Sequence, residues 1–449
     1  MSRICVVGAG YVGLVTGACF AELGHRVACV DIDKGKVIAL TRGVMPFYEP
    51  GLEALVLENM RRRRLAFTTS FREAVKKADF IFMCVGTPII YQKRVDLSYL
   101  HLAYMKACAA LSGNTPVFVN KSTVPPGTAD MMGNIMSGQL NGHGPLKVAA
   151  NPEFLREGHA VEDFLHPSRI VIGARDPEVA GAVEALYANI SASRMITDPV
   201  TAELVKYAGN AFLATKISFI NEIALLCEKL GVDVGQVAQG MGLDPRIGPD
   251  FLKAGIGYGG SCLPKDTAAL THFFEAYCRG ATLLKATIDV NSRQPWRLVQ
   301  RIKNALGTLD GARVAVLGLT FKPDTDDVRC SPAVELVKGL LLEGAEVRAC
   351  DPLAWRQASA IDLRVAGIRD PYEAAAGCDA VALATDWEEY RTLDLHRLKN
   401  VMRGHLLADG RNVIDPKLAR EAGFLYLGVG RPTPGADPVG KSKTPSGGY

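Results

Sequence analysis

Apolar residues in the N-terminal part of the chain come in short runs that end at glycine or at an acidic residue. The run from Ile4 to Val7 leads into a glycine-containing turn, and a helix-like segment follows to Leu23. A second run, Val27 to Val30, ends at Asp31. Continuous apolar runs of this length are typical of strands in a parallel sheet, because both faces of such strands are buried. The order of strand, turn, helix, strand and acid predicts a βαβ unit.

The glycines of the first turn, Gly8, Gly10 and Gly13, have the spacing of a dinucleotide-binding fingerprint. Gly8 makes the turn, Gly10 lets the backbone approach a pyrophosphate, and Gly13 lets the helix pack closely on the strand. The helix N-terminus then offers unpaired N–H groups to phosphate. Asp31 stands where a carboxylate binds the adenosine ribose, which predicts NAD rather than NADP as cofactor.

Three further apolar runs, at 80–85, 117–120 and 148–150, predict additional strands of this sheet. Each run ends in small or polar residues, and ligands of an open α/β sheet collect at the carboxyl ends of its strands. The same residue types are common in turns and helix caps, which is the competing interpretation of each residue taken alone. The candidate site residues in these segments are Thr87, Thr123, Glu153 and Glu157.

Apolar residues recur at helical spacing from 201 to 230, and neither Gly nor Pro interrupts the pattern after Gly209. A helix of this length often connects domains or forms a dimer seam. Lys206 and Asn210 are four residues apart and therefore share one face of this helix. Without further context, a solvated helix face explains the pair better than a binding site does.

A second α/β pattern begins near Gly311. Its segment 344–351 resembles 24–31, so the two halves of the chain look like two copies of one nucleotide-binding architecture. After the strand of the second copy, Lys322 stands where the first copy uses bare backbone, which predicts phosphate binding by a point charge. The second copy's strands are predicted at 313–317, 346–350 and 379–384.

The predicted fold is α/β, with two Rossmann-like parallel-sheet domains joined by a long central helix and a helical dimerisation region. We expect residues 1–200 to form the NAD-binding domain and 201–305 the central helical domain. Residues 306–430 are expected to form the second Rossmann-like domain, which would bind a nucleotide-linked substrate. The Pro-, Gly-, Ser- and Lys-rich residues 431–449 are expected to be disordered.

Charge and cysteine pattern exclude several classes of protein. The chain has 51 Lys+Arg and 47 Asp+Glu, and a formal charge of +4 is too small to indicate nucleic acid as a partner. The 11 cysteines are scattered without a CxxC pair or metal-ligand spacing, so we expect no metal site and a reducing, cytoplasmic location. The N-terminus has no signal-peptide pattern, and no uncharged segment reaches the roughly 20 residues that span a bilayer. We therefore expect no membrane association.

The segment Gly257–Asp266 places Cys262 in a glycine-rich loop, with Lys265 and Asp266 close behind it. Glycine lets a backbone approach a ligand closely, and a nearby cation favours the thiolate, which is the attacking form of cysteine. Taken alone, the residue is better explained as a buried structural cysteine in a tight turn. The rest of the chain favours a site for covalent chemistry.

Together these motifs resemble the UDP-glucose/GDP-mannose dehydrogenase family, over almost the whole length from Ile4 to about Gly430. Residues 242–258 and the segment Asp409-Gly410-Arg411-Asn412 are similar to the branch of the family that acts on UDP-glucose. The motifs that carry the resemblance are the N-terminal fingerprint, Gly86-Thr87-Pro88, Ser122–Thr128, Asn151–Glu157, Gly257–Asp266 and Gly318–Lys322.

The resemblance implies two successive NAD-dependent oxidations at C6 of UDP-glucose, from alcohol to carboxylate, which give UDP-glucuronate. An aldehyde donates no hydride readily until a nucleophile has added to it. The resemblance assigns this addition to Cys262, through a thiohemiacetal and then a thioester. Lys206 and Asn210 would stabilise the developing oxyanion. A two-electron dehydrogenase would not need the thiol.

Further roles follow from the same resemblance. Asp266 would act in proton transfer with a water held near Thr123. Glu157 and Glu153 would assist hydrolysis of the thioester. The implied catalytic residues are therefore Cys262, Lys206, Asn210, Asp266, Thr123, Glu157 and Glu153.

The resemblance also implies two sets of binding residues and a homodimer in which Arg246 reaches the partner's site. Two alternatives stay open: the same chemistry on GDP-mannose or a UDP-N-acetylhexosamine, and a nucleotide-sugar sensor without turnover. The implied cofactor-binding residues are Gly8, Gly10, Tyr11, Val12, Gly13, Asp31, Lys36, Thr87, Thr123, Glu157, Lys265 and Arg329. The implied substrate-binding residues are Glu153, Phe154, Leu155, Arg156, Glu157, Lys206, Asn210, Arg246, Phe251, Leu252, Lys253, Ala254, Gly255, Gly259 and Lys322.

Overall fold

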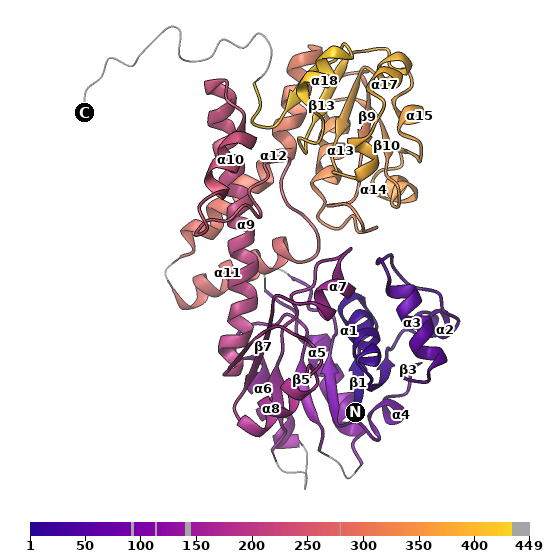
Figure 1. Ribbon diagram of the computed structural model, residues 1–449, viewed down its shortest axis with the longest axis vertical. Coiled ribbons are helices and arrows are strands. Elements are labelled where there is room, and N and C mark those ends of the chain that lie inside the picture. Colours follow the sequence, from indigo (N-terminus) through magenta and orange to yellow (C-terminus); the bar gives the residue numbers. More distant parts are fainter. Residues whose placement is uncertain (91–93, 113–114, 140–144, 279, 433–449) are drawn as a thin grey trace, which may run out of the picture. The chain divides into compact units, whose positions relative to one another are not determined.

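The computed structural model describes residues 1–90, 94–112, 115–139, 145–278 and 280–432. The chain divides into two compact units, Met1–Gly209 and Asn210–Tyr449, and each is described by itself (Figure 1). Of the tail that the sequence predicts to be disordered, residues 433–449 lie outside the described residues.

The first unit is built on an eight-stranded sheet. Its strand order is β3-β2-β1-β4-β5-β6-β7-β8, so the chain reverses its direction of travel across the sheet between β1 and β4. Neighbouring strands are parallel except β6 and β7, which run antiparallel. The strands are β1 (Arg3–Val7), β2 (Arg26–Val30), β3 (Leu65–Thr68), β4 (Phe80–Met83), β5 (Val117–Asn120), β6 (Val148–Ala150), β7 (Arg169–Ala174) and β8 (Ser193–Thr197).

Helices cover both faces of this sheet (Figure 1). In β1, Ile4 and Val6 belong to the core under one face, whereas Cys5 and Val7 belong to the core under the other. This explains the unbroken apolar run, because alternate side chains of a strand point to opposite faces. The helices are α1 (Tyr11–Glu22), α2 (Lys34–Thr41), α3 (Leu52–Arg61), α4 (Phe71–Val75), α5 (Ser98–Ala109), α6 (Thr128–Gln139), α7 (Ala160–Leu165) and α8 (Pro177–Ala185).

Helix α9 (Pro199–Leu230) has 32 residues and crosses the division between the units. Its length and mean hydropathy would allow it to cross a membrane, although 39% of its most apolar window is buried inside the protein. The helix also contains buried polar residues, among them Glu203, Lys206, Asn210 and Asn221. These features are those of a helix in a folded domain.

The second unit contains a six-stranded, fully parallel sheet with the order β11-β10-β9-β12-β13-β14. This is the same order as the first six strands of the other unit, which confirms the two Rossmann-like sheets predicted from the internal similarity. Its strands are β9 (Arg313–Leu317), β10 (Glu346–Cys350), β11 (Ala366–Ile368), β12 (Ala380–Leu383), β13 (Leu406–Asp409) and β14 (Leu425–Gly428).

Helices α12 and α13 pack on one face of this sheet, and α15, α17 and α18 pack on the other (Figure 1). Helices α10 and α11 precede the sheet in the sequence; Arg246 lies in the segment between them, and Cys262 lies directly before α11. The helical elements are α10 (Val234–Gly242), α11 (Leu263–Tyr277), α12 (Thr282–Leu306), α13 (Pro332–Leu342), η2 (Trp355–Gln357), α14 (Ala358–Ile361), α15 (Pro371–Ala375), α16 (Glu388–Arg391), α17 (Leu395–Val401) and α18 (Pro416–Glu421).

Candidate functional site

A cavity of about 350 Å³ lies at the carboxyl ends of β1, β2 and β4 in the first unit. This is the point at which the strand order reverses, where open α/β sheets bind their ligands. The cavity is lined by Gly8, Gly10, Asp31 and Lys36, all predicted from sequence, and by Gly86 next to the predicted Thr87.

The turn between β1 and α1 requires glycine at positions 8 and 13. Gly8 has φ +98°, and a Cβ there would also approach the Cys84 carbonyl oxygen to 2.7 Å. A Cβ on Gly13 would collide with the Gly8 backbone. A Cβ on Gly10 would meet no atom within 4 Å, and no side chain caps the helix there. The first turn of α1, which includes Tyr11 and Val12, thus leaves room and backbone N–H groups for a phosphate.

Asp31 is held ionised at the end of β2. Its carboxylate accepts hydrogen bonds from the backbone of Ala9 (2.8 Å) and Asp33 (2.9 Å) and from Lys36 Nζ (3.2 Å). Burial alone would raise the pKa of Asp31, but these hydrogen bonds outweigh burial and leave the pKa below its ordinary value. An ionised acceptor at this position suits the hydroxyl groups of a ribose.

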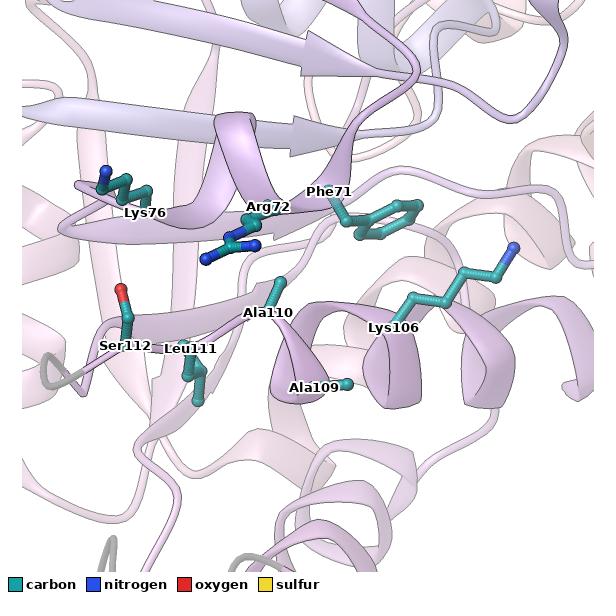
Figure 2. Close-up of a pocket in the computed structure, with 8 residues that line it drawn as sticks. All are labelled: Phe71, Arg72, Lys76, Lys106, Ala109, Ala110, Leu111 and Ser112. Atoms are coloured by element: carbon teal, nitrogen blue, oxygen red, sulfur yellow. The ribbon is translucent and has the colours of Figure 1, made fainter.

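A second hollow of about 630 Å³ adjoins this cavity and shares Phe71 and Lys106 with it. Figure 2 shows its rim, where Lys106 lies along the Phe71 ring, with Arg72 and Lys76 on the segment that includes α4. The lining is positively charged and open, and it contains none of the site residues predicted from sequence.

Two predicted site residues, Glu153 and Lys206, form a buried ion pair in the first unit. Their charged atoms are 3.1 Å apart, and each side chain is 4% exposed. Glu153 follows β6 and also accepts a hydrogen bond from the Leu155 backbone at 2.6 Å. The Lys206 ammonium lies 5.4 Å from the centre of the Phe154 ring. The sequence placed these residues in one site without predicting that they pair.

The other residues of this loop differ in exposure. Arg156 is exposed and pairs with Asp163 at 2.6 Å, whereas Glu157 is buried.

Thr87 donates a hydrogen bond to the backbone oxygen of Thr123 at 2.8 Å, and this bond joins the loops after β4 and β5. Parallel neighbouring strands bring these two predicted residues together.

Glu49 is a residue of this region that the sequence did not reveal. It is buried, it accepts hydrogen bonds from the backbone of Gly158 and Ala160 (both 2.6 Å), and it is hydrogen bonded to the Tyr11 hydroxyl. Burial and the adjacent carboxylate raise the pKa of Tyr11 well above its usual value. The only signal in the sequence is an acid before Pro50-Gly51, which is common in surface turns.

In the second unit, Cys262 is the N-cap residue of α11, and its side chain is partly exposed. Its hydroxyl-bearing neighbour Ser261 lies 3.6 Å from the sulfur. The partial positive charge of a helix N-terminus favours a thiolate. Pro264 is typical of the first helical turn, but no helix was predicted to begin here.

Asp266 lies one turn further along α11 and is almost fully buried. It accepts a hydrogen bond from the Asn210 side-chain amide at 2.6 Å and pairs with Lys265 at 2.6 Å. Its backbone N–H donates to the Cys262 carbonyl at 2.8 Å. Four residues predicted as catalytic or cofactor-binding are thus brought together at the start of one helix.

The glycine-rich loop before Cys262 is fixed from several sides. The Gly260 N–H donates to the Arg329 carbonyl at 3.1 Å, and Gly259 packs so closely on the Cys330 backbone that a Cβ would collide with it. The Arg411 guanidinium donates to the Gly257 carbonyl at 2.8 Å. Arg411 belongs to a motif noted in the sequence, but its function in holding this loop was not predicted.

The remaining predicted binding residues of the second unit lie in two loops. Lys253 pairs with Asp386 at 2.8 Å, while its neighbours Leu252 and Ala254 are buried. Phe251 has φ +62°, which is rare for a residue with a side chain. Gly255 packs against Gly410. Lys322 lies 5.8 Å from the centre of the Phe321 ring.

Arg246 is 88% exposed and pairs with Asp244 two residues earlier, at 2.6 Å. Arg329 is likewise exposed and pairs with Asp327 at 2.7 Å.

All 11 cysteines are free thiols, and no cluster of potential metal ligands occurs in the part of the chain that the structure describes.

The fold and site define a class, the α/β proteins with a dinucleotide-type first domain and a second nucleotide-type domain. Three family models match the chain, all of the UDP-glucose/GDP-mannose dehydrogenase family: its NAD binding domain at residues 2–191, its central domain at 200–293 and its UDP binding domain at 315–416. The chain belongs to this family.

Curated relatives match over nearly the whole length. The UDP-glucose 6-dehydrogenase of Rhizobium meliloti (strain 1021) is 47% identical, with 96% of this chain and 100% of the relative covered. UDP-glucose 6-dehydrogenase TuaD of Bacillus subtilis (strain 168) is 43% identical, with 96% and 94% covered.

Solved structures agree. A UDP-glucose dehydrogenase from Pyrobaculum islandicum superimposes with a TM-score of 0.90 at 42% identity, covering 96% of this chain and 98% of the other. A UDP-D-ManNAc dehydrogenase from Pyrococcus horikoshii gives a TM-score of 0.86 at 30% identity, covering 96% and 99%.

Proposed function

We propose that this chain catalyses the NAD-dependent oxidation of UDP-glucose to UDP-glucuronate, with Cys262 as the covalent nucleophile. The observation that supports this most directly is the cluster of Cys262, Lys265, Asp266 and Asn210 at the start of α11. The curated relatives at 43% and 47% identity are both UDP-glucose 6-dehydrogenases, which favours this nucleotide sugar over the alternatives.

The first unit fits NAD. The turn after β1 provides open space and free N–H groups for the pyrophosphate, and Asp31 provides the acceptor for the adenosine ribose. An acid at this position disfavours the additional phosphate of NADP. When bound, NAD⁺ supplies the acceptor for each hydride.

The residues of the chain account for the rest of the reaction. Loss of hydride and proton from the C6 alcohol gives an aldehyde, to which the Cys262 sulfur adds with protonation of the oxygen, forming a thiohemiacetal. Loss of a second hydride and the hydroxyl proton gives a thioester, and water then releases the carboxylate and the thiol. Lys206 and Asn210 stabilise the oxyanions, and Asp266 exchanges protons through water near Thr123.

Glu157 and Glu153 assist hydrolysis of the thioester. The remaining predicted site residues bind the cofactor or the nucleotide sugar. Those of the first unit hold the cofactor, and the segment 251–255, Gly259 and Lys322 hold the nucleotide sugar, with Lys322 as a point charge on phosphate. The family resemblance also assigns Lys265 and Arg329 to cofactor binding.

We further propose a homodimer, in which Arg246 reaches the partner's site. Phe212, Phe219 and Leu226 are seven residues apart on α9 and 64%, 46% and 56% exposed. Residues spaced by seven lie on one face of a helix, so this apolar stripe is suited to burial against a second copy. The proposed domains are 1–200, 201–305 and 306–430, and the proposed location is the cytoplasm.

The test is to incubate the protein with NAD⁺ and a panel of UDP- and GDP-sugars and to measure the NADH formed per sugar consumed. We expect two NADH per UDP-glucose, with UDP-glucuronate as product. One NADH per sugar would indicate a two-electron alcohol dehydrogenase, turnover of another sugar would change the substrate, and no NADH with any sugar would indicate a sensor.

A further inference from the structure

Lys121 is a buried charge to which the proposed mechanism gives no role. It follows β5, directly before Ser122 and Thr123, and is 5% exposed. Its ammonium donates to the Asn151 side-chain oxygen (3.0 Å) and to the Tyr187 hydroxyl (3.2 Å). Among the described residues, no carboxylate lies within ion-pair distance of it. A charge held by neutral partners is costly to bury, so its position calls for a physical reason.

The neutral partners hold the ammonium rigidly. The Tyr187 hydroxyl donates to the Asn151 oxygen at 2.5 Å, and the Asn151 amide nitrogen donates to the Val171 carbonyl at 2.8 Å. The rings of Phe164 and Tyr187 lie with their centres 5.7 and 5.6 Å from the ammonium. This network joins the end of β5 to β7 and to the segment that follows α8, and it fixes the charge at one point.

The charged groups around this point belong to the candidate site. Glu153 and Lys206 both interact electrostatically with Lys121, Glu153 favouring the ammonium and Lys206 opposing it. Cys84 also faces Lys121, and burial raises the pKa of its thiol to about 12, so it is neutral. Lys121, Glu153 and Arg169 also line one small cavity, together with Asp163. Asp163 is already paired with Arg156, and the Arg169 guanidinium lies 3.9 Å from the centre of the Phe154 ring.

The result is one buried carboxylate near two buried ammonium groups. We propose that Lys121 is a positioning residue that acts through Glu153 and Lys206: its buried ammonium attracts the Glu153 carboxylate and repels the Lys206 ammonium, and so sets the electrostatic field at that pair. This inference deepens the proposed function and rests on it, because that function assigns Lys206 to oxyanion stabilisation and Glu153 to hydrolysis of the thioester.

A role of the Lys121 charge would show in the pH dependence of activity. A positive charge lowers the pKa of every neighbouring titrating group, so its removal raises them all. Burial lowers the pKa of Lys121 itself to about 8, so Lys121 loses its charge within the pH range of the assay. Replacing Lys121 by the uncharged, similarly shaped methionine should therefore move both limbs of the pH profile to higher pH.

The experiment measures kcat and kcat/KM for UDP-glucose with NAD⁺ from pH 5.5 to 10 in the wild type, Lys121→Met and Lys121→Arg. We expect Lys121→Met to lower kcat at least tenfold and to move both limbs upward by half a pH unit or more. We expect Lys121→Arg, which keeps the charge, to leave the acid limb near its wild-type position. The exposed Lys147 provides a matched control, and Lys147→Met should leave the profile unchanged.

A second pair of variants covers the case in which Lys121→Met does not fold. Tyr187→Phe removes a hydroxyl that accepts from the ammonium, so the alkaline limb should move to lower pH. Tyr104→Phe removes an equally buried hydroxyl that donates to the Asn120 side chain at 2.7 Å, and it should move neither limb.

The outcomes separate cleanly. If Lys121→Met and Tyr187→Phe change the height of the profile but not its limbs, Lys121 has only a structural role and the inference is wrong. If the limbs move oppositely to the directions given, it is also wrong. A wild type that makes no NADH from UDP-glucose overturns the proposed function, and the inference with it.

Discussion

The side-chain amide of Asn210 on α9 donates to the Asp266 carboxylate on α11 over 2.6 Å, and the acceptor is almost fully buried. The amide nitrogen is thereby oriented by a charge, as a preorganised donor must be. The same carboxylate pairs with Lys265 and is one helical turn from Cys262.

We expect Asp266→Asn to lower kcat by about 10²–10³, because the neutral amide neither exchanges protons as a carboxylate does nor orients Asn210. The change in KM for UDP-glucose should be much smaller. Steady-state kinetics test this, with Asp289→Asn as control, since Asp289 forms an exposed pair with Arg293 on α12. An Asp266→Asn enzyme with wild-type kcat would remove Asp266 from the mechanism.

Cys262→Ala should abolish formation of UDP-glucuronate, with a loss of at least about 10³ in kcat, because the aldehyde then has no nucleophile. Cys330 is the matched control. It is an exposed thiol whose backbone touches the same loop, and Cys330→Ala should retain activity. The measurement is product analysis by chromatography after a fixed time. Wild-type product formation by Cys262→Ala would exclude the covalent route.

Asp31→Ala should raise KM for NAD⁺ about tenfold or more, because a charged acceptor of a ribose hydroxyl is worth about 1.5–3 kcal/mol. It should also reduce the preference for NAD⁺ over NADP⁺, since the acid no longer repels the added phosphate. Initial rates with both cofactors test this. Asp176→Asn, at the N-cap of α8, is the control and should behave as wild type. An unchanged cofactor preference would contradict the assignment of Asp31.

Phe212→Glu combined with Leu226→Glu should convert the proposed dimer to a monomer, because two charges replace the centre of the apolar stripe. Light scattering coupled to size-exclusion chromatography measures the mass. Leu363→Glu is the control, since Leu363 is 92% exposed in the second sheet domain and lies outside the stripe. A wild type that is already monomeric would contradict the proposed assembly.

Lys121 also makes a prediction about stability. Its pKa in the folded protein, about 8, lies below the unfolded value of about 10.4, so the unfolded chain binds more protons between these limits. The free energy of unfolding should therefore rise with pH across this window, by up to roughly 3 kcal/mol relative to Lys121→Met. Denaturant unfolding of both proteins at pH 7.5 and 10 measures the difference, and a difference independent of pH would contradict it.

Sequence predicted the parts of this protein that are set by local pattern. The βαβ unit at the N-terminus, the long helix around Lys206 and the second sheet beginning at Arg313 all follow from apolar runs, glycines and helical spacing. The pattern did not reveal β3, β7 and β8 in the first sheet or β11, β13 and β14 in the second. It also did not reveal the antiparallel pairing of β6 with β7, which depends on where a strand is added rather than on its composition.

The features of the candidate site that the sequence did not predict are contacts between residues far apart in the chain. The partners Glu153 and Lys206 are 53 positions apart, and Asn210 and Asp266 are 56 apart, so no local spacing connects them. Glu49 and Arg411 were missed for a related reason. Each forms hydrogen bonds with backbone groups of a distant loop. Because almost every residue has the same backbone groups, the sequence does not indicate which of them is the partner.

The hydrogen bonds of Glu49 matter for any attempt to change the cofactor specificity of the protein. One carboxylate bonds at once to Tyr11, at the edge of the pyrophosphate turn, and to the amides of Gly158 and Ala160, just beyond Glu157. A protein engineer who reshapes the turn to accept a different cofactor therefore also disturbs the stretch that carries Glu153 to Glu157. Libraries that vary either stretch should keep Glu49 and Tyr11 fixed.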